Sequence, residues 1–216
     1  MKITTGIYKF KKIHTLKSHK LRPTSNKIRN AVFNILVNKY IMNTWSAKAH
    51  LLDAFSGSGI VAIEGLSRNI NKVTLIEADS TVFEYLKKNI EALDLKKKVN
   101  IINDDFFNTR LTKNEYFIVY LDPPYLKNFT NLAIKKILDE KALKQGAIIV
   151  SETNKNYKYD KYLNQYISIQ KKYGKKVKIK NFDKPESWLK RKLSSSIGND
   201  IINITQELES RYLWNK

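Results

Sequence analysis

The stretch that decides the fold is residues 51–59, which read LLDAFSGSG. An apolar strand ends at Asp53, and a turn with two glycines, Gly57 and Gly59, leads into a segment whose apolar residues have helical spacing. Glycines in such a turn let backbone N–H groups approach a ligand at the beginning of a helix. A Gly-x-Gly pattern alone also fits a plain strand-to-helix turn. The surrounding residues must therefore decide between a ligand-binding loop and a simple connection.

Strand-like and helix-like segments alternate around this turn. Apolar runs rich in β-branched and aromatic residues predict strands at residues 50–55, 72–77, 99–103, 117–121 and 147–150. Helical periodicity predicts helices at residues 60–68, from a capping Ser80 to about residue 93, and around residues 132–138. This alternation is typical of an α/β protein with a mostly parallel sheet and helices on both faces.

Two further segments predict how the sheet ends. Two late strands, predicted at about residues 166–170 and 175–180, flank a Tyr173-Gly174 turn. This pattern is typical of an antiparallel hairpin, which would make the sheet mixed. The chain of 216 residues has the length of one domain with small additions. We expect a basic arm and helix at residues 1–48 that pack on a main domain at residues 49–182. Residues 183–216 form an extension that we expect to be largely helical.

The charge is large and unevenly placed. The chain has 40 Lys and Arg against 20 Asp and Glu, a net charge of +20. The first 52 residues hold 11 of the basic residues and no acidic one. Such a block favours a protein that binds a polyanion such as nucleic acid, although a lysine-rich composition throughout the chain is the alternative.

Composition also argues against several classes of protein. The chain has no cysteine, and its three histidines, His14, His19 and His50, lack metal-ligand spacing. No apolar run approaches the roughly 20 residues of a membrane helix, and the first residues do not resemble a secretory signal. We therefore expect a cytoplasmic protein without a bound metal, a disulfide or a membrane span.

Acidic residues near the glycine turn indicate the kind of ligand. Asp53 would repel the pyrophosphate of a dinucleotide but suits a ligand with a positive amino group, such as S-adenosylmethionine. Glu77 stands at the end of the next predicted strand, where a carboxylate can accept hydrogen bonds from two ribose hydroxyls. The two residues favour a nucleoside ligand with an amino-acid end.

A second motif indicates the chemistry. The predicted strand at residues 117–121 runs directly into Asp122-Pro123-Pro124-Tyr125. Prolines hold the backbone and have no N–H donor of their own, so Asp122 and the Pro123 carbonyl can both accept from one exocyclic amine. Two acceptors favour the pyramidal amine, whose lone pair can attack a methyl sulfonium, and Tyr125 supplies a ring on which an extruded base can stack. As an isolated tetrapeptide this motif also fits an ordinary turn after a strand.

Together these motifs resemble the class I S-adenosylmethionine-dependent methyltransferases with an (Asp/Asn)-Pro-Pro-(Tyr/Phe) motif. Within that class the chain resembles the RsmD family, which methylates N2 of a guanine in bacterial small-subunit ribosomal RNA. The resemblance covers residues 3–182 and rests on three stretches. These are LRPT at 21–24 with IRNAVFNIL at 28–36, residues 52–59 with EGLSR at 64–68, and LDPPY at 121–125.

The resemblance assigns roles to individual residues. The cofactor-binding residues that it implies are Asp53, Ser56, Gly57, Gly59, Glu77, Ala78, Asp105 and Phe106. The implied catalytic residues are Asp122, Pro123, Pro124 and Tyr125. From the charge pattern, the expected RNA-binding residues are Lys11, Lys12, Lys17, Lys20, Arg22 and Arg29. Asp104 precedes Asp105, so either carboxylate can face the adenine.

The resemblance implies a Rossmann-like fold with a seven-stranded sheet and a terminal antiparallel reversal. It implies methyl transfer from S-adenosylmethionine to guanine N2 in 16S ribosomal RNA. We expect a monomer. We expect its substrate to be a partly assembled small subunit, since a chain with no room for a separate recognition domain needs the shape of the RNA for specificity. One alternative is a DNA adenine-N6 or cytosine-N4 methyltransferase, which would usually need such a domain.

Another alternative is a non-enzymatic RNA-binding protein with a vestigial cofactor fold. The intact motif at residues 122–125 argues against this alternative. Because the glycine turn lies far from the arm in the sequence, we also expect deletion of residues 1–20 to change cofactor affinity little.

Overall fold

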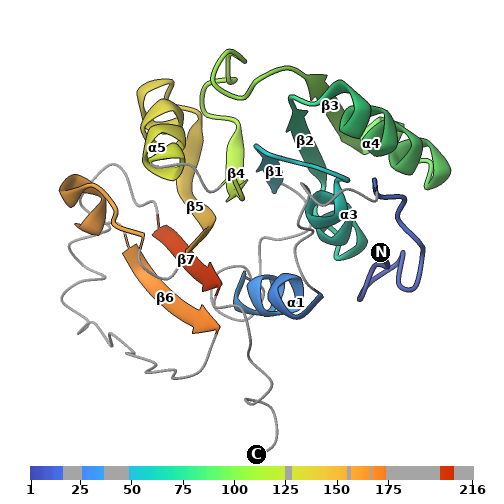
Figure 1. Cartoon of the computed structure of the whole chain (residues 1–216), viewed down its shortest axis with the longest axis horizontal. Helices are drawn as coiled ribbons and strands as arrows, with labels where there is room; N and C mark the ends of the chain where they lie inside the picture. The colour runs from blue at the N-terminus through green and yellow to red at the C-terminus, as the bar shows by residue number, and fades with distance from the viewer. Residues whose placement is uncertain are drawn as a thin grey trace, which may run out of the picture.

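The computed structural model describes residues 1–16, 26–36, 49–124, 128–154, 157–165, 167–173 and 200–206 (Figure 1). Seven strands of this part form one sheet in the order β3-β2-β1-β4-β5-β7-β6. The strands are β1 (His50–Asp53), β2 (Lys72–Glu77), β3 (Val99–Asn103), β4 (Tyr116–Leu121), β5 (Leu143–Asn154), β6 (Ile167–Tyr173) and β7 (Asp200–Gln206). The helices are α1 (Asn26–Ile35), α3 (Ile60–Ser67), α4 (Ser80–Ala92) and α5 (Phe129–Asp139), with short 3-10 helices η2 (Lys96–Lys98) and η3 (Lys161–Gln165).

The order of the strands creates a switch point at the centre of the sheet. The chain first adds β2 and β3 on one side of β1 and then returns to place β4 on the other side. Both neighbours of β1 run parallel to it, with Asp53 opposite Leu75 and Tyr120. In open α/β sheets a ligand crevice forms at the carboxyl ends of the strands where the order reverses. Here that position lies between Asp53 and the residues that follow β4.

Apolar side chains cover both faces of the sheet, as the alternating pattern predicts. Leu51 of β1 packs in a core with residues of α1, α3 and α4, whereas its neighbour Leu52 packs in a second core with residues of α5. The same alternation separates Ile118 from Val119 on β4. Successive side chains of a strand point to opposite faces, so one strand contributes to two cores. The predicted class, a Rossmann-like α/β fold with helices on both faces, is confirmed.

The capping residue of α4 differs from the sequence prediction. Asp79, and not Ser80, is the N-cap, because the Asp79 side chain accepts hydrogen bonds from the backbone N–H groups of Thr81 and Val82 at 2.8 and 3.0 Å. Ser80 is the first helical residue and donates to Asn103 instead. An aspartate at this position accepts from N–H groups that have no partner within the helix. Its negative charge also interacts favourably with the positive end of the helix dipole.

The end of the sheet also differs from the prediction. β6 continues through Tyr173, and residues 174–180 lie outside the described residues. The neighbour of β6 is β7, which lies between β5 and β6, and all pairings between the named strands are parallel. The expected terminal antiparallel reversal is therefore not found in the described part of the chain.

The helical prediction for the extension is wrong at residues 200–206, which form β7. This segment is rich in β-branched residues, whose restricted side-chain rotamers favour extended backbone over helix. The other residues of the extension lie outside the described part, so their structure stays a prediction.

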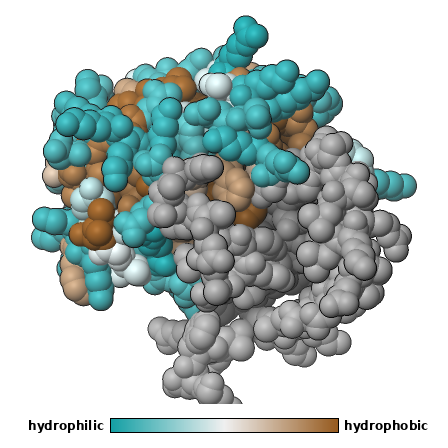
Figure 2. Space-filling view, turned by 180° about the vertical axis from the view of Figure 1, so that it is seen from behind, coloured by the Kyte–Doolittle hydropathy of each residue, from teal (hydrophilic) through white to brown (hydrophobic). Residues whose placement is uncertain are grey.

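The N-terminal segment packs on the face of the sheet that α1, α3 and α4 cover. Residues 1–16 form a looped strap in which Lys2 and Lys12 make an isolated antiparallel bridge, and Ile3 and Ile13 are buried in the core. Seen from behind, hydrophilic side chains cover most of the described surface, with separate hydrophobic groups among them (Figure 2). Among the residues described, none of the helices has the length and apolar character needed to cross a membrane.

Candidate active site

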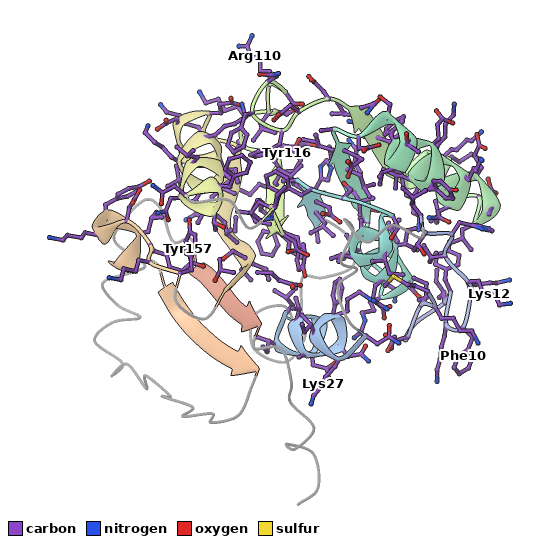
Figure 3. The ribbon with its side chains drawn as sticks, viewed as in Figure 1. Phe10, Lys12, Lys27, Arg110, Tyr116 and Tyr157 are labelled. Atoms are coloured by element: carbon purple, nitrogen blue, oxygen red, sulfur yellow. The ribbon has the colours of Figure 1, made fainter. Side chains whose placement is uncertain are left out.

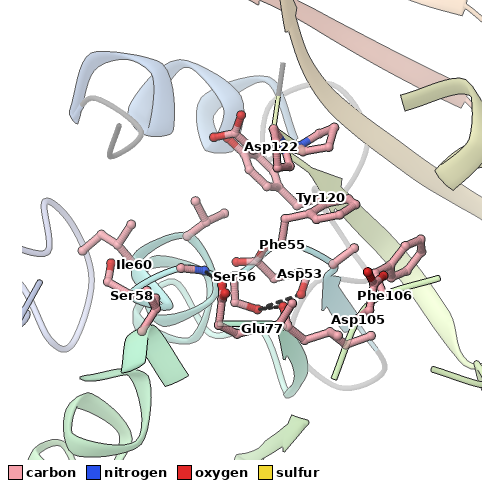
Figure 4. Close-up of a pocket in the computed structure, with 18 of the residues that line it drawn as sticks. Asp53, Phe55, Ser56, Ser58, Ile60, Glu77, Asp105, Phe106, Tyr120 and Asp122 are labelled. Carbon is pink, nitrogen blue, oxygen red and sulfur yellow. Dashed lines mark hydrogen bonds between the residues drawn. The ribbon is translucent and has the colours of Figure 1, made fainter. Parts of the chain in front are cut away.

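A cavity of about 360 Å³ lies at the switch point of the sheet (Figure 4). Its wall contains the residues at the carboxyl ends of β1 and β2, Asp53 and Glu77, and the residue that follows β4, Asp122. The structure brings together in this wall most of the residues that the sequence predicts for the site. They are Asp53, Ser56, Gly57, Glu77, Ala78, Asp105, Phe106, Asp122, Pro123 and Pro124.

The glycine turn is held by hydrogen bonds to the neighbouring strand. The Ser56 hydroxyl donates to the carbonyl oxygens of Asp53 and Ile76 at 2.8 and 3.1 Å, and the Ser56 N–H also donates to Ile76 at 3.0 Å. Gly57 and Gly59 both have positive φ angles, 53° and 75°. A left-handed backbone favours glycine, so both positions need it for conformational reasons.

The two glycines face different surroundings. A Cβ atom built on Gly57 meets no atom within 4 Å, whereas one built on Gly59 would lie 2.4 Å from Leu86 Cδ1. Gly57 lines the cavity, but Gly59 does not. Gly59 instead lets the beginning of α3 pack closely against the core, so its predicted direct contact with a cofactor has no support from the cavity wall.

Asp53 has an unusual environment for a carboxylate. It is 2% exposed, and its Oδ2 atom is buried without a hydrogen-bond partner in the described part of the chain. Burial, together with the negative charges of Asp122 and Glu77, raises the pKa of Asp53 to about 8. A buried acceptor without a partner is costly unless a donor reaches it. The oxygen is therefore suited to an ammonium group entering the cavity.

Glu77 holds the turn and faces the cavity at the same time. Its Oε2 accepts from the Gly57 N–H at 2.8 Å and its Oε1 accepts from the Asp79 N–H at 2.9 Å. Burial raises the pKa of Glu77 above its ordinary value. A carboxylate has about four acceptor sites, so these two hydrogen bonds leave capacity for hydroxyl groups of a ligand.

Aromatic rings form a continuous apolar part of the wall. The ring of Phe106 lies 5.3 Å from that of Phe55 and 5.5 Å from that of Phe107, and Phe107 lies 5.5 Å from Phe129. All four residues line the cavity. Flat apolar walls with a few polar groups are typical of sites for nucleosides and other small molecules. Of these four rings, only Phe106 could be predicted, because phenylalanines in apolar runs have no sequence signal that separates a cavity wall from the core.

The structure distinguishes between the two adjacent aspartates after β3. Asp105 lines the cavity, and its Oδ1 accepts from the Phe107 N–H at 2.7 Å. The Asp104 carboxylate accepts instead from the Asp105 N–H at 2.7 Å and from the Thr109 hydroxyl at 3.4 Å. Of the two, Asp105 is thus the residue placed to meet a ligand.

The proline motif closes another side of the cavity. Asp122 is partly exposed, Pro123 is buried and Pro124 is exposed. All three line the cavity. Figure 4 shows Asp122 and Tyr120 on the same side of the pocket. Tyr125, the last residue of the motif, lies outside the described residues, so its role stays a prediction.

A buried polar pair that the sequence analysis missed lies directly behind this motif. Tyr120 lines the cavity, and its hydroxyl donates a hydrogen bond to the Glu152 carboxylate on β5. Burial, followed by the charges of Glu152 and Asp122, raises the pKa of Tyr120 well above its ordinary value, so the hydroxyl stays a neutral donor. The only available signal would have been a tyrosine and a glutamate at the ends of two adjacent apolar strands.

The N-terminal strap also contributes to the cavity. Thr15 and Leu16 are part of the wall, although they are far in sequence from the strands that build it. The premise that the glycine turn lies away from the arm is therefore wrong, whereas the expected effect of deleting residues 1–20 on cofactor affinity stays a prediction. Sequence separation did not reveal that the strap folds back over the end of the sheet.

The predicted RNA-binding residues differ in their exposure to solvent. Lys11 and Lys12 are exposed on the strap, and Lys17, Lys20 and Arg22 lie outside the described residues. Arg29 is 0% exposed and lies 3.8 Å from Glu64, and it donates to the Lys2 carbonyl oxygen at 3.0 Å. The prediction that Arg29 contacts RNA is wrong, because its guanidinium is used inside the protein to join α1, α3 and the strap.

Comparisons with known proteins agree with this geometry. The family described as "Conserved hypothetical protein 95" matches residues 1–181. The Ribosomal RNA small subunit methyltransferase D of Haemophilus influenzae is 34% identical over 160 residues, which cover 72% of this chain and 80% of that protein. The chain belongs to the ribosomal RNA small subunit methyltransferase D family.

Other relatives extend the comparison. The Ribosomal RNA small subunit methyltransferase D of Escherichia coli is 30% identical over 154 residues, with 71% of this chain and 74% of that protein covered. A solved Escherichia coli protein described as a methyltransferase has a TM-score of 0.62 and 28% identity, covering 74% of this chain and 86% of the other. The region that matches this methyltransferase D family includes the whole cavity wall, whereas β7 lies beyond it.

Proposed function

We propose that this chain transfers a methyl group from S-adenosylmethionine to the exocyclic N2 of a guanine in small-subunit (16S) ribosomal RNA. The observation that carries the proposal is one cavity with two unlike ends. Asp53 offers a buried acceptor without a partner in the described residues, and Asp122, Pro123 and Pro124 line the same space. The names of the relatives support ribosomal RNA of the small subunit as the substrate.

The residues present fit the cofactor. The Asp53 Oδ2 atom can accept from the ammonium of the methionine end, and the space beside Gly57 leaves room for that end. Ser56 holds the turn in this shape. Glu77 would accept from the ribose hydroxyls, while Asp105, Phe106 and Ala78 would surround the adenine. When bound, S-adenosylmethionine supplies an electrophilic methyl group on its sulfonium.

The proline motif would prepare the target amine. An exocyclic amine is a weak nucleophile, because its lone pair is delocalised into the base. Asp122 and the Pro123 carbonyl would each accept one of its hydrogen bonds and favour the pyramidal form, while Pro124 holds the backbone and Tyr125 stacks on the base. Positioning and electrostatics supply such a step without a covalent intermediate. No metal is required by this arrangement.

The basic arm would bind the RNA backbone. Within residues 1–48, the exposed Lys11 and Lys12 and the basic residues at 17, 20 and 22 would contact phosphates. Residues 49–182 would form the catalytic domain. Residues 183–216 would be a C-terminal extension, of which residues 200–206 form β7 between β5 and β6. We propose that the chain acts as a monomer in the cytoplasm on a partly assembled small subunit, whose RNA shape provides specificity.

The test is a methylation assay with tritiated S-adenosylmethionine on unmodified 16S ribosomal RNA, on protein-bound 16S RNA and on DNA. Digestion of the product to nucleosides should give N2-methylguanine, and Asp122→Ala should remove it. N6-methyladenine or N4-methylcytosine in DNA as the only product would show that the proposed substrate is wrong.

A further inference from the structure

The N-terminal strap presents an exposed aromatic ring among lysines. Phe10 is 69% exposed, and Ile7 is 62% exposed, the largest values among the large hydrophobic residues of the described chain. Lys9, Lys11 and Lys12 are also exposed, and residues 1–16 contain no acidic residue. Figure 3 shows Phe10 and Lys12 projecting outward from the strap. Such an aromatic group has no role in the core.

The backbone holds this ring in a conformation that phenylalanine rarely adopts. Phe10 has a φ angle of 69°, in the left-handed region that favours glycine. Its N–H donates to the Ile3 carbonyl oxygen at 2.9 Å, and the following N–H, of Lys11, donates to Tyr8 at 3.0 Å. Backbone strain of this kind is often found at functional sites.

The base of the turn is rigidly attached to α3. The Ile7 N–H donates to the Ser67 carbonyl oxygen at 2.8 Å, and the Tyr8 N–H donates to the Ser67 hydroxyl at 2.9 Å. A Cβ atom on Gly6 would lie 1.7 Å from that carbonyl oxygen, so only glycine permits this contact. A binding group that is already fixed loses less conformational entropy when it binds.

The chemistry of the turn fits single-stranded RNA. Bases without a pairing partner stack on aromatic rings, and lysines close by neutralise the phosphates. The Lys9 Nζ atom lies 4.7 Å from the centroid of the Phe10 ring, a cation–π distance, and the large exposed fraction of Phe10 leaves ring surface for a base. An acidic partner protein would also be attracted by the lysines, but it would not need a flat ring in a fixed orientation.

We propose that the turn at residues 6–12 docks an unpaired base of the substrate RNA, stacked on Phe10, with Lys9, Lys11 and Lys12 on the adjoining phosphates. The proposal rests on the proposed function and adds a contact outside the catalytic cavity. It also explains why the strap is rigid at its base and exposed at its tip.

The variant Phe10→Gly tests this proposal, because it separates binding from folding. Glycine suits the φ angle of 69°, so the melting temperature should stay equal or rise. Binding of the full-length protein to protein-free 16S RNA should weaken by about 5- to 150-fold, the range of one lost stacking contact. The slope of binding against salt should not change. Phe10→Trp should retain binding, because it keeps a stacking surface.

Lysine variants and a control complete the experiment. Lys11→Ala or Lys12→Ala should reduce the salt slope by about 0.7 to 0.9, the effect of one lost phosphate contact. Leu132→Ala removes another exposed apolar side chain, on α5, and should change nothing. Wild-type binding by Phe10→Gly would overturn the proposal. A loss seen only with protein-bound RNA would also overturn it, since it would indicate a protein partner.

The experiments distinguish a failure of this docking proposal from a failure of the proposed function. If Phe10→Gly binds RNA normally and still forms N2-methylguanine, only the docking proposal fails. If the wild-type protein methylates no ribosomal RNA, the proposed function fails, whatever the binding data show.

Discussion

The carboxamide of Asn89 holds the backbone of His14 from both sides. Its Oδ1 accepts from the His14 N–H at 2.7 Å, and its Nδ2 donates to the His14 carbonyl oxygen at 2.8 Å. The same Nδ2 donates to the Ser58 carbonyl oxygen, in the glycine turn, at 3.0 Å. Asn89 is 1% exposed on α4. One buried side chain therefore connects the basic strap to the turn that lines the cavity.

Because of this connection, we expect Asn89→Ala to weaken binding of S-adenosylhomocysteine by roughly fivefold or more, although Asn89 does not line the cavity. Loss of the two hydrogen bonds to His14 loosens the end of the strap that carries Thr15 and Leu16, and loss of the third loosens the turn at Ser58. Isothermal titration calorimetry measures the change.

Two controls accompany this variant. Lys87→Ala, on the exposed face of α4, should bind as the wild type does. By linkage, RNA bound to the strap should raise cofactor affinity in the wild type more than in Asn89→Ala. Equal affinities of Asn89→Ala and the wild type would show that the strap and the cavity are independent.

Cofactor affinity should depend on the ionisation of Asp53. Its pKa of about 8 means that the free protein holds a proton there at neutral pH, and an ammonium ligand must displace it. Affinity should rise with pH by at most about tenfold per unit up to about pH 8, with uptake of less than one proton by the buffer for each ligand bound. Calorimetry in buffers of different ionisation enthalpy counts that proton, and Asp53→Asn should abolish the release.

The same pKa predicts how stability depends on pH. The folded-state pKa of Asp53 lies above the ordinary value of 3.8, so between about pH 4 and 8 the folded chain binds more protons than the unfolded chain. The contribution of Asp53 to the free energy of unfolding is therefore fully present below pH 4 and is lost as the pH rises to about 8. Asp53→Asn should show less of this decline in urea titrations at several pH values.

Asp122→Ala should separate catalysis from binding. We expect turnover to fall by roughly 100-fold or more, because one of two acceptors on the target amine is lost. The variant should still bind S-adenosylhomocysteine. Since the charge of Asp122 raises the pKa of Asp53, the rise of affinity with pH should also move to lower pH in this variant. Asp122→Asn should be milder, because its amide oxygen can still accept.

The two glycines of the turn should respond differently to alanine. Gly59→Ala should lower the free energy of unfolding by about 2 kcal/mol or more, because its Cβ would lie 2.4 Å from Leu86 Cδ1 and its φ angle is positive. Gly57→Ala should cost only about 1 kcal/mol, from its positive φ angle, but should weaken cofactor binding because its Cβ enters open space in the cavity. Denaturant melts and calorimetry distinguish the two effects, and equal losses of stability would contradict this assignment.

Much of the fold could be predicted from local patterns. Alternating apolar runs predicted β1 to β5, the helices α3, α4 and α5, and a helix within the N-terminal arm, because period-2 and period-3.6 patterns reflect which side chains must be buried. The motif at residues 122–125 indicated methyl transfer to an amine. It could be recognised in the sequence because the groups that act on the amine come from consecutive residues. The parts that local patterns did not reveal are β7, which pairs with strands far away in sequence, and the burial of Arg29.

The sequence by itself determined which chemical groups the site can use and the order of most strands and helices along the chain. Tertiary structure alone decided which of those groups share the cavity: Asp105 but not Asp104, and Thr15 from a strap expected to be independent. It also decided that Asp53 is a carboxyl with a pKa of about 8. The reason is physical: burial, charge–charge distance and ring packing depend on contacts between segments far apart in the chain, and periodicity and motif spacing record only neighbours.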